Sequence, residues 1–248
     1  MLSTGINELD RILKGGFRRP TSIALSGPRA SGKSTLASRI QESAMDKGLP
    51  GLYITYYHNP LAILRLWKRL GIRATQYAEK GLVRVFDPFS ATHGISKDLL
   101  FSRLDEEWIG WRNYVDYIEN PEDIDSYRQQ QVAAIEKLSG TGGVNVIDTT
   151  NLRFTRLPPA DAAAYFAGME TELGDMKQQS SIHIVDLDEG SDPNVNFVER
   201  NQHALVNLAR VVGRDGVFRL TVEYNTAGPF LGRELQYTLG RSGFLVVH

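Results

Sequence analysis

Eight residues near the N-terminus indicate both a fold class and a ligand: Gly27-Pro28-Arg29-Ala30-Ser31-Gly32-Lys33-Ser34. They match in full the Walker A pattern of phosphate-binding loops, G-x-x-x-x-G-K-[ST]. Glycines let the backbone wrap an anion, while successive N–H groups and the start of the next helix point at it. The motif predicts a nucleotide site with Lys33 at the β- and γ-phosphates and the Ser34 hydroxyl on Mg²⁺. The Thr35 hydroxyl is expected near the α-phosphate.

The residues on either side of the loop have the pattern that this motif requires. The apolar run at 22–25 predicts a strand that ends just before the loop, and residues 35–47 predict the helix after it. A glycine loop that arose by chance has no reason to lie between a strand and a helix. The phosphate-binding interpretation is therefore favoured over a chance match.

Strands and helices alternate outward from this unit. Further buried strands are predicted at 52–56, 82–86, 144–147 and 182–185, and helices at 60–70 and 160–176. Such alternation is typical of parallel βαβ units, whose sheet is covered by helices on both faces. After residue 207 the segments are short, β-rich and separated by turns, which predicts antiparallel strands at the sheet edge. The predicted fold class is α/β.

No linker, repeat or low-complexity segment divides the 248 residues. The sequence therefore predicts a single domain, 1–248, with a helical insertion at about 96–138 that is broken at Asn120-Pro121. Aromatic residues in this insertion are predicted to pack in the core or, where exposed, to contact a partner: Trp108, Trp111, Tyr114 and Tyr117.

Composition and charge exclude several classes of protein. Lys and Arg number 28 against 29 Asp and Glu, so the chain lacks the basic excess of a dedicated nucleic-acid binder. Cysteine is absent, which excludes thiol catalysis, disulfide scaffolds and Cys-ligated zinc. Neither a signal peptide nor a membrane span is visible, so a cytoplasmic location without a membrane partner is expected.

An acidic residue ends the strand predicted at 144–147. A strand-terminal aspartate commonly accompanies a Walker A loop and holds Mg²⁺, often through water. Asp148 is the candidate for this Walker B role, so Ser34 and Asp148 are the predicted metal ligands. The alternative is an ordinary aspartate that caps a turn or a helix.

Several further segments resemble the KaiC-like branch of the RecA/RadA ATPase superfamily, and the resemblance covers nearly the whole chain. They are Ser3-Thr4-Gly5-Ile6-Asn7-Glu8-Leu9-Asp10 with Gly15-Gly16, residues 48–55, residues 79–82 and residues 237–244. The resemblance implies a RecA-like P-loop NTPase core with a mainly parallel twisted sheet and antiparallel C-terminal strands. It also implies ATP with Mg²⁺ as ligands, and a homo-oligomer or an assembly with a homologous RecA-fold subunit.

Two departures from the family concern hydrolysis. KaiC-type ATPases end the second strand with adjacent glutamates that activate water, whereas Tyr57 and His58 occupy those positions here. His58 either orients water or is a polar strand-end residue without chemistry. The family's Lys-x-Arg pair, which reaches a neighbouring subunit's γ-phosphate, is also missing, since no Lys or Arg lies between Arg219 and Arg233. Hydrolysis is therefore expected to be slow or absent, with ATP as a structural or signalling ligand.

Acidic residues follow the strand predicted at 182–185. Asp186, Asp188 or Glu189 could approach the γ-phosphate and replace the missing base, but a solvated turn is the favoured interpretation. The acidic residues of segment 186–200 also repel a nucleic-acid backbone, which disfavours a recombinase-type grip on DNA.

A basic stretch leaves nucleic-acid binding open. Arg65, Lys68, Arg69 and Arg73 form either a binding patch or an ordinary solvated helix face. The main functional alternative is accordingly an active ATPase of the RecA/RadA-paralogue type that assists DNA recombination or repair. A third alternative is a KaiC-like phosphotransferase.

Overall fold

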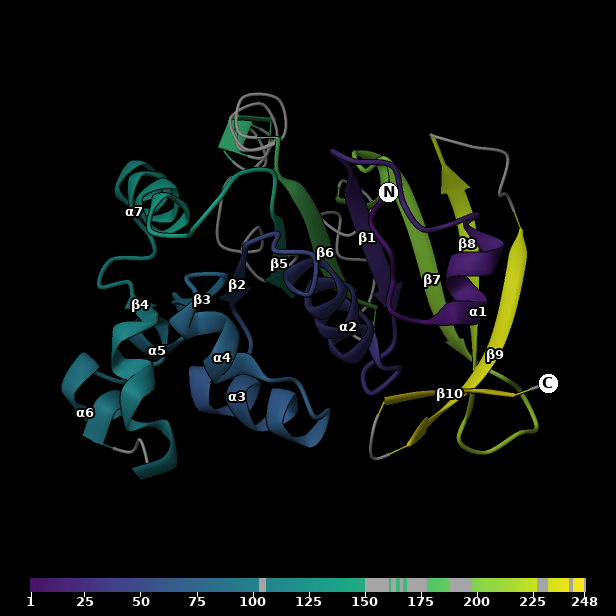
Figure 1. The fold of residues 1–248 in the computed structure, drawn as a ribbon, viewed down its shortest axis with the longest axis horizontal. Coiled ribbons are helices and arrows are strands. Elements are labelled where there is room, and N and C mark those ends of the chain that lie inside the picture. Colours follow the sequence, from purple (N-terminus) through teal and green to yellow (C-terminus); the bar gives the residue numbers. More distant parts are fainter. Residues whose placement is uncertain are drawn as a thin grey trace.

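The computed structural model describes residues 1–102, 106–149, 161, 164–165, 167–168, 178–187, 198–226, 232–240 and 243–247, with the backbone alone at 106–108 and Tyr224. Its centre is one sheet in the order β10-β9-β8-β7-β1-β6-β5-β2-β3-β4, which runs across Figure 1 from β9 and β10 on the right to β4 on the left. The strands are β1 (Ser22–Gly27), β2 (Gly51–Thr55), β3 (Val83–Asp87), β4 (Val115–Tyr117), β5 (Val144–Asp148), β6 (Ser180–Asp186), β7 (Ala204–Arg210), β8 (Val217–Asn225), β9 (Arg233–Gly240) and β10 (Gly243–Val247).

The pairing of neighbouring strands changes from parallel to antiparallel at β7. All pairs from β7 through β1 to β4 are parallel, whereas β7–β8, β8–β9 and β9–β10 are antiparallel. The predicted α/β class, with a mainly parallel sheet and antiparallel C-terminal strands, is confirmed. The carboxyl ends of β1, β6, β5 and β2 lie side by side, and this edge carries the predicted phosphate loop.

Helices cover both faces of the sheet. They are α1 (Asn7–Ile12), α2 (Lys33–Met45), α3 (Pro60–Arg69), α4 (Ala74–Glu79), α5 (Phe89–Thr92), α6 (Lys97–Ser102), the 3₁₀ helix η1 (Glu106–Asn113) and α7 (Ile124–Glu136). Tyr53 of β2 packs in one buried cluster with apolar residues of α2, α3 and α4. Its neighbours Leu52 and Ile54 pack in the other cluster with α7, because successive side chains of a strand point to opposite faces.

The predicted helical run at 96–138 is wrong at one point. Val115–Tyr117 form β4, which pairs with β3 so that Val115 lies opposite Val85. The open edge of β3 offers hydrogen-bond partners, and β-branched and aromatic residues suit a strand, so sheet pairing overrides the helical spacing. The boundaries of the single domain and of its insertion stay predictions.

The aromatic residues of the insertion support the core interpretation where their side chains are described. Trp111 is buried, and its ring lies 5.9 Å from that of Trp67 and 5.7 Å from that of Tyr114. The side chain of Trp108 lies outside the described residues. So do residues 151–159 and most of the segments 160–176 and 186–200. No helix in the described ranges is long and apolar enough to cross a membrane.

Asp87 ends β3 with a carboxylate that is completely buried. The Ser90 N–H donates to its Oδ1 at 3.0 Å, while Oδ2 accepts no hydrogen bond from any described residue. Burial raises the pKa of Asp87 to about 6 from an ordinary value of 3.8, against the opposing effect of hydrogen bonds from Ser90. Folding therefore favours the protonated acid, and the folded state loses stability as pH rises from about 4 through 6.

Asp87→Asn should therefore raise the free energy of unfolding at pH 8 by about 1–3 kcal/mol, and the gain should vanish at pH 4. Asparagine keeps the acceptor for the Ser90 N–H but needs no buried charge. Urea denaturation of both proteins at the two pH values measures the difference. A variant that is less stable than the wild type at pH 8 would show that the carboxylate is stabilising.

Candidate functional site

The phosphate loop lies between the end of β1 at Gly27 and the start of α2 at Lys33. Gly32 caps the helix with φ of 92°, a left-handed conformation that glycine adopts without strain. At Gly27 the backbone passes so close to β7 that a Cβ would lie 2.2 Å from the Leu208 carbonyl oxygen. Both glycines of the motif are thus required by local geometry, as the sequence predicts.

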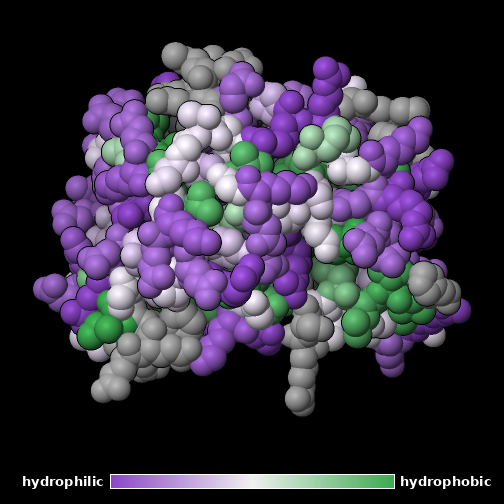
Figure 2. Space-filling model, in the orientation of Figure 1, coloured by the Kyte–Doolittle hydropathy of each residue, from purple (hydrophilic) through white to green (hydrophobic). Residues whose placement is uncertain are grey.

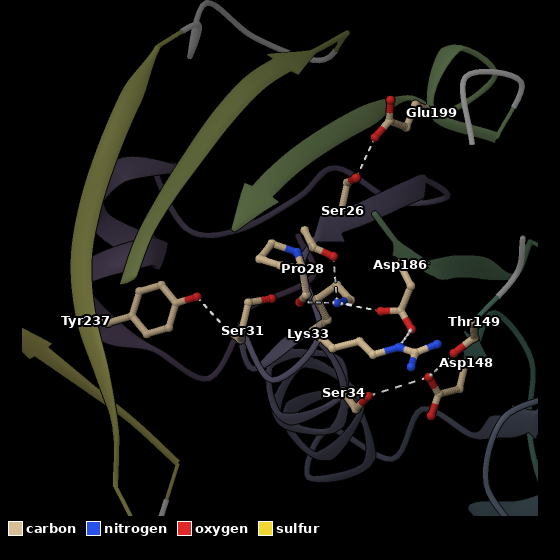
Figure 3. A network of polar contacts seen from close by, with 12 residues as sticks. Ser26, Pro28, Ser31, Lys33, Ser34, Asp148, Thr149, Asp186, Glu199 and Tyr237 are labelled. Atoms are coloured by element: carbon tan, nitrogen blue, oxygen red, sulfur yellow. Dashed lines mark hydrogen bonds and ion pairs between the residues drawn. The ribbon is translucent and has the colours of Figure 1, made fainter. Parts of the chain in front are cut away.

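Lys33 points back across the mouth of the loop, and only 5% of its side chain is exposed. Its ammonium donates to the carbonyl oxygens of Gly27 at 2.8 Å and Pro28 at 2.7 Å. It also forms an ion pair with Asp186 at the end of β6, where Nζ lies 2.7 Å from Oδ1 (Figure 3). The lysine is therefore held in place at the point where the motif predicts phosphate.

Ser34 and Asp148 meet beside this lysine. The Ser34 hydroxyl lies 3.5 Å from Asp148 Oδ1, and the Tyr53 hydroxyl donates to Oδ2 at 3.0 Å (Figure 3 shows the Ser34 contact). Burial raises the pKa of Asp148, partly offset by the charge of His58 and by hydrogen bonds from Tyr53 and Thr149. A hydroxyl and a carboxylate side by side are hard oxygen donors of the kind that Mg²⁺ takes, so these residues fit the predicted metal.

Tyr57 and His58 lie just past the end of β2, and their rings contact each other at 4.6 Å between centroids. The Arg29 guanidinium of the phosphate loop lies 5.2 Å from the centre of the Tyr57 ring. The turn is fixed by the Thr55 hydroxyl, which donates to the His58 carbonyl and accepts from the His58 N–H. These two positions therefore present an aromatic ring and an imidazole to the site, and neither supplies a carboxylate.

A cavity of about 770 Å³ joins these groups. Nine of the predicted site residues line it: Arg29, Ala30, Gly32, Lys33, Ser34, Thr35, Tyr57, His58 and Asp148. Gly27, Pro28 and Ser31 complete the loop beneath it through their backbones. The far side is formed by α3 and the β9–β10 hairpin, with Leu66, Arg69, Leu239, Gly240 and Gly243. The structure thus brings all the predicted positions to one place.

The rim of the cavity is partly apolar. Figure 2 shows a mainly hydrophilic face with apolar groups gathered over the β9–β10 end of the sheet. Leu239 and Leu245 are 37% and 51% exposed there. The basic side chains of α3 and of Arg73, the N-cap residue of α4, are also exposed. Those of α3 are Arg65, Lys68 and Arg69, and Arg73 pairs with Asp46 at 3.4 Å.

Comparison with known proteins shows the family. The model of the KaiC ATPase family matches residues 2–219. The chain belongs to the KaiC ATPase family. The predicted resemblance to the KaiC-like branch is thereby confirmed, and with it a nucleotide-binding RecA-fold P-loop protein.

The curated proteins similar to this KaiC family member share about a quarter to a third of the aligned residues with it, over less than half of the chain. A UPF0273 protein of Pyrococcus furiosus is 31% identical over 97 residues, which is 39% of each chain. The circadian clock oscillator protein KaiC of Thermostichus vulcanus is 26% identical over 98 residues, or 40% of this chain and 19% of that protein. These alignments span less than half of the curated relatives. The crystal structure of a KaiC-like protein from Pyrococcus horikoshii OT3 covers 99% of this chain with a TM-score of 0.72 at 14% identity, which shows the shared fold.

The structure corrects one interpretation of the acidic residues. Asp186 is not part of a solvated turn, since its side chain is only 15% exposed and pairs with Lys33. Its position at the end of β6, which pairs directly with β1, is the signal that points to the site. Asp188 and Glu189 lie outside the described residues.

Sequence reasoning also missed two tyrosines. Tyr53 of β2 supports the predicted metal ligand Asp148, as described above. Tyr237 of β9 is completely buried, and its hydroxyl donates to the Ser31 carbonyl oxygen at 2.6 Å. Its ring packs against Phe244 at 4.4 Å between centroids. Tyr237 therefore ties the C-terminal hairpin to the phosphate loop.

Tyr237→Phe should lower nucleotide affinity about 3- to 10-fold and the free energy of unfolding by about 1–2 kcal/mol. The ring packing stays, but the buried Ser31 carbonyl loses its partner and the loop loses a restraint. Calorimetric titration with ADP and urea denaturation measure both effects. The control is Tyr77→Phe, which removes a hydroxyl that donates to Asp46 at 2.5 Å, away from the loop. Equal nucleotide affinities in the two variants would contradict the role of Tyr237.

Proposed function

We propose that this KaiC family member binds ATP together with Mg²⁺ and hydrolyses it slowly or not at all. One observation carries the proposal: the phosphate-loop lysine and the Ser34–Asp148 oxygen pair share a cavity whose remaining catalytic positions hold Tyr57 and His58. The first two features suit a magnesium nucleotide. The last two remove the carboxylate base on which family hydrolysis depends.

The proposal that the protein binds MgATP is supported by the charge of Lys33, by the N–H groups of the loop and by the oxygen atoms of Ser34 and Asp148. The loop backbone and Lys33 suit the phosphates, and the cavity extends from them toward α3 and the β9–β10 hairpin. Ser34 and Asp148 would hold Mg²⁺, which supplies positive charge to the β- and γ-phosphate oxygens when it is bound. Asp148 is only 2% exposed. The hydroxyls of Tyr53 and Thr149 donate to its two carboxylate oxygens and hold the carboxylate in one orientation.

The hydrolysis half rests on what surrounds the expected attacking water. Tyr57 contacts Arg29 and His58 instead of presenting a carboxylate. The region where the family places its trans-acting cations is the end of β8 and the turn after it, and residues 220–232 contain neither Lys nor Arg. Loss of such a cation costs about 10³-fold or more in rate, and loss of a base about 10²- to 10⁴-fold.

ATP then acts as a structural or signalling ligand, which stabilises one assembly state by mass action. Self-assembly, or assembly with a homologous RecA-fold subunit, is part of the proposal and is supported by the family and by the exposed Leu239 and Leu245. A cytoplasmic location and a single nucleotide-binding domain over residues 1–248 complete it.

The test pairs calorimetric titration of MgATP with phosphate release on the same sample, with and without single-stranded DNA. Tight binding with negligible release is the expected result. Robust release without DNA would overturn the hydrolysis half, and release that DNA stimulates would instead favour an ATPase that assists recombination or repair. Absence of binding would overturn the whole proposal.

A further inference from the structure

A protein carboxylate lies where the site should receive phosphate. Asp186 Oδ1 is 2.7 Å from Lys33 Nζ, and Oδ2 is 3.9 Å from Arg29 Nε. Both cations belong to the phosphate loop, and Figure 3 shows Asp186 beside Lys33 at the mouth of the loop. Its carboxylate therefore neutralises the same side chains that a bound polyphosphate would need.

Lys33 has no hydrogen-bond donor left for a phosphate while Asp186 is bound to it. A lysine ammonium has three donors, and here they serve the Gly27 carbonyl, the Pro28 carbonyl and Asp186. The lysine is 5% exposed, so no face is left for a further ligand. A phosphate oxygen reaches Lys33 only after one of these three acceptors has left. The two carbonyls are fixed in the backbone of β1 and the loop, whereas the Asp186 side chain can rotate away.

We propose that Asp186 is an internal competitor for the phosphate chain, and that it lowers the affinity of the site for ligands with phosphates beyond the α-position while leaving the affinity for AMP unchanged. The inference rests on the proposed function. A ligand whose β- or γ-phosphate replaces the carboxylate regains the contact with Lys33, whereas a ligand that ends at the α-phosphate leaves the Asp186 ion pair intact. Displacement also releases Asp186 from Arg29, so that both loop cations become available to the ligand together.

The test is calorimetric titration of ADP and AMP into the wild type and Asp186→Asn, in EDTA so that no metal bridges a carboxylate and the phosphates. Asparagine removes the charge and keeps the size. The expected result is an ADP affinity about 10- to 100-fold higher in the variant, the range for a hydrogen bond to a charged group, with an unchanged AMP affinity. Asp186→Glu, which restores the charge, should return the ADP affinity toward the wild-type value. If Asp186→Asn does not fold by circular dichroism, Asp186→Ser provides the neutral side chain.

The matched control is Glu199→Gln. Glu199 is a neighbouring carboxylate that accepts from the Ser26 hydroxyl of β1 at 2.5 Å, and glutamine can still accept that bond. This variant should bind ADP as the wild type does. An equal gain in Glu199→Gln, an equal gain for AMP and ADP, or an ADP affinity in Asp186→Asn that is unchanged or lower would each overturn the inference while wild-type binding upholds the proposed function. If the wild type does not bind MgATP in the titration described under the proposed function, the proposed function fails, and this inference with it.

Discussion

Lys33→Ala should lower the affinity for ATP at least about 100-fold, which corresponds to about 2.7 kcal/mol of binding free energy. The ammonium is the buried cation at the position for the β- and γ-phosphates, and charge-assisted hydrogen bonds are the strong ones. The loss has two parts. Alanine removes the cation, and it also leaves the Asp186 carboxylate beside the phosphates without the Lys33 ion pair.

Calorimetric titration of MgATP measures the total loss, and the double variant Lys33→Ala with Asp186→Asn separates its parts. The double variant should recover some affinity because it no longer repels the phosphates. Lys47→Ala is the matched control, since this exposed lysine lies just beyond the end of α2. A Lys33→Ala protein that binds ATP as the wild type does would remove the phosphate loop from the proposed site.

Replacing Tyr57 and His58 together by glutamate should raise phosphate release about 10²-fold or more, the contribution that a positioned general base typically makes. Both side chains already line the cavity, and the backbone turn that presents them is fixed by Thr55. Steady-state phosphate release at saturating MgATP measures the change. Glutamine at both positions is the matched control, because it has the same shape and no basic carboxylate.

If the glutamate and glutamine variants release phosphate equally slowly, the base is not what limits hydrolysis. The missing cations of the 220–232 region would then be the better explanation. A wild-type protein that already hydrolyses as fast as the glutamate variant would instead identify a base elsewhere in the chain.

The parts of the fold that depend on local pattern could be predicted from sequence. The phosphate loop between a strand and a helix is one, and the strand that carries Asp148 is another, because a motif of known spacing constrains both. Val115–Tyr117 was missed because three residues of an edge strand have no periodicity of their own, and pairing with β3 determines their conformation.

Contacts between residues far apart in the chain could not be predicted from the sequence. Tyr237 and Ser31 are 206 positions apart, and no spacing rule links them. Asp186 was recognised as a strand-end acid, but its contact with Lys33 depends on β6 pairing with β1 in the sheet. Charge patterning alone favours a solvated turn there, since most acidic residues after a strand face water. Because β6 lies next to β1 in the sheet, Asp186 instead lies beside the phosphate loop and pairs with Lys33.

The position of β1 has a consequence for synthesis on the ribosome. This strand leaves the exit tunnel early, yet both of its neighbours come late, since Ser22 pairs with Ser181 and Ile23 with Ala204. A nascent chain that has not reached β6 therefore carries a strand with two open edges, which are sites for wrong pairing between chains. Completion of the central sheet, and with it of the nucleotide site, therefore waits until β6 and β7 have also left the ribosome.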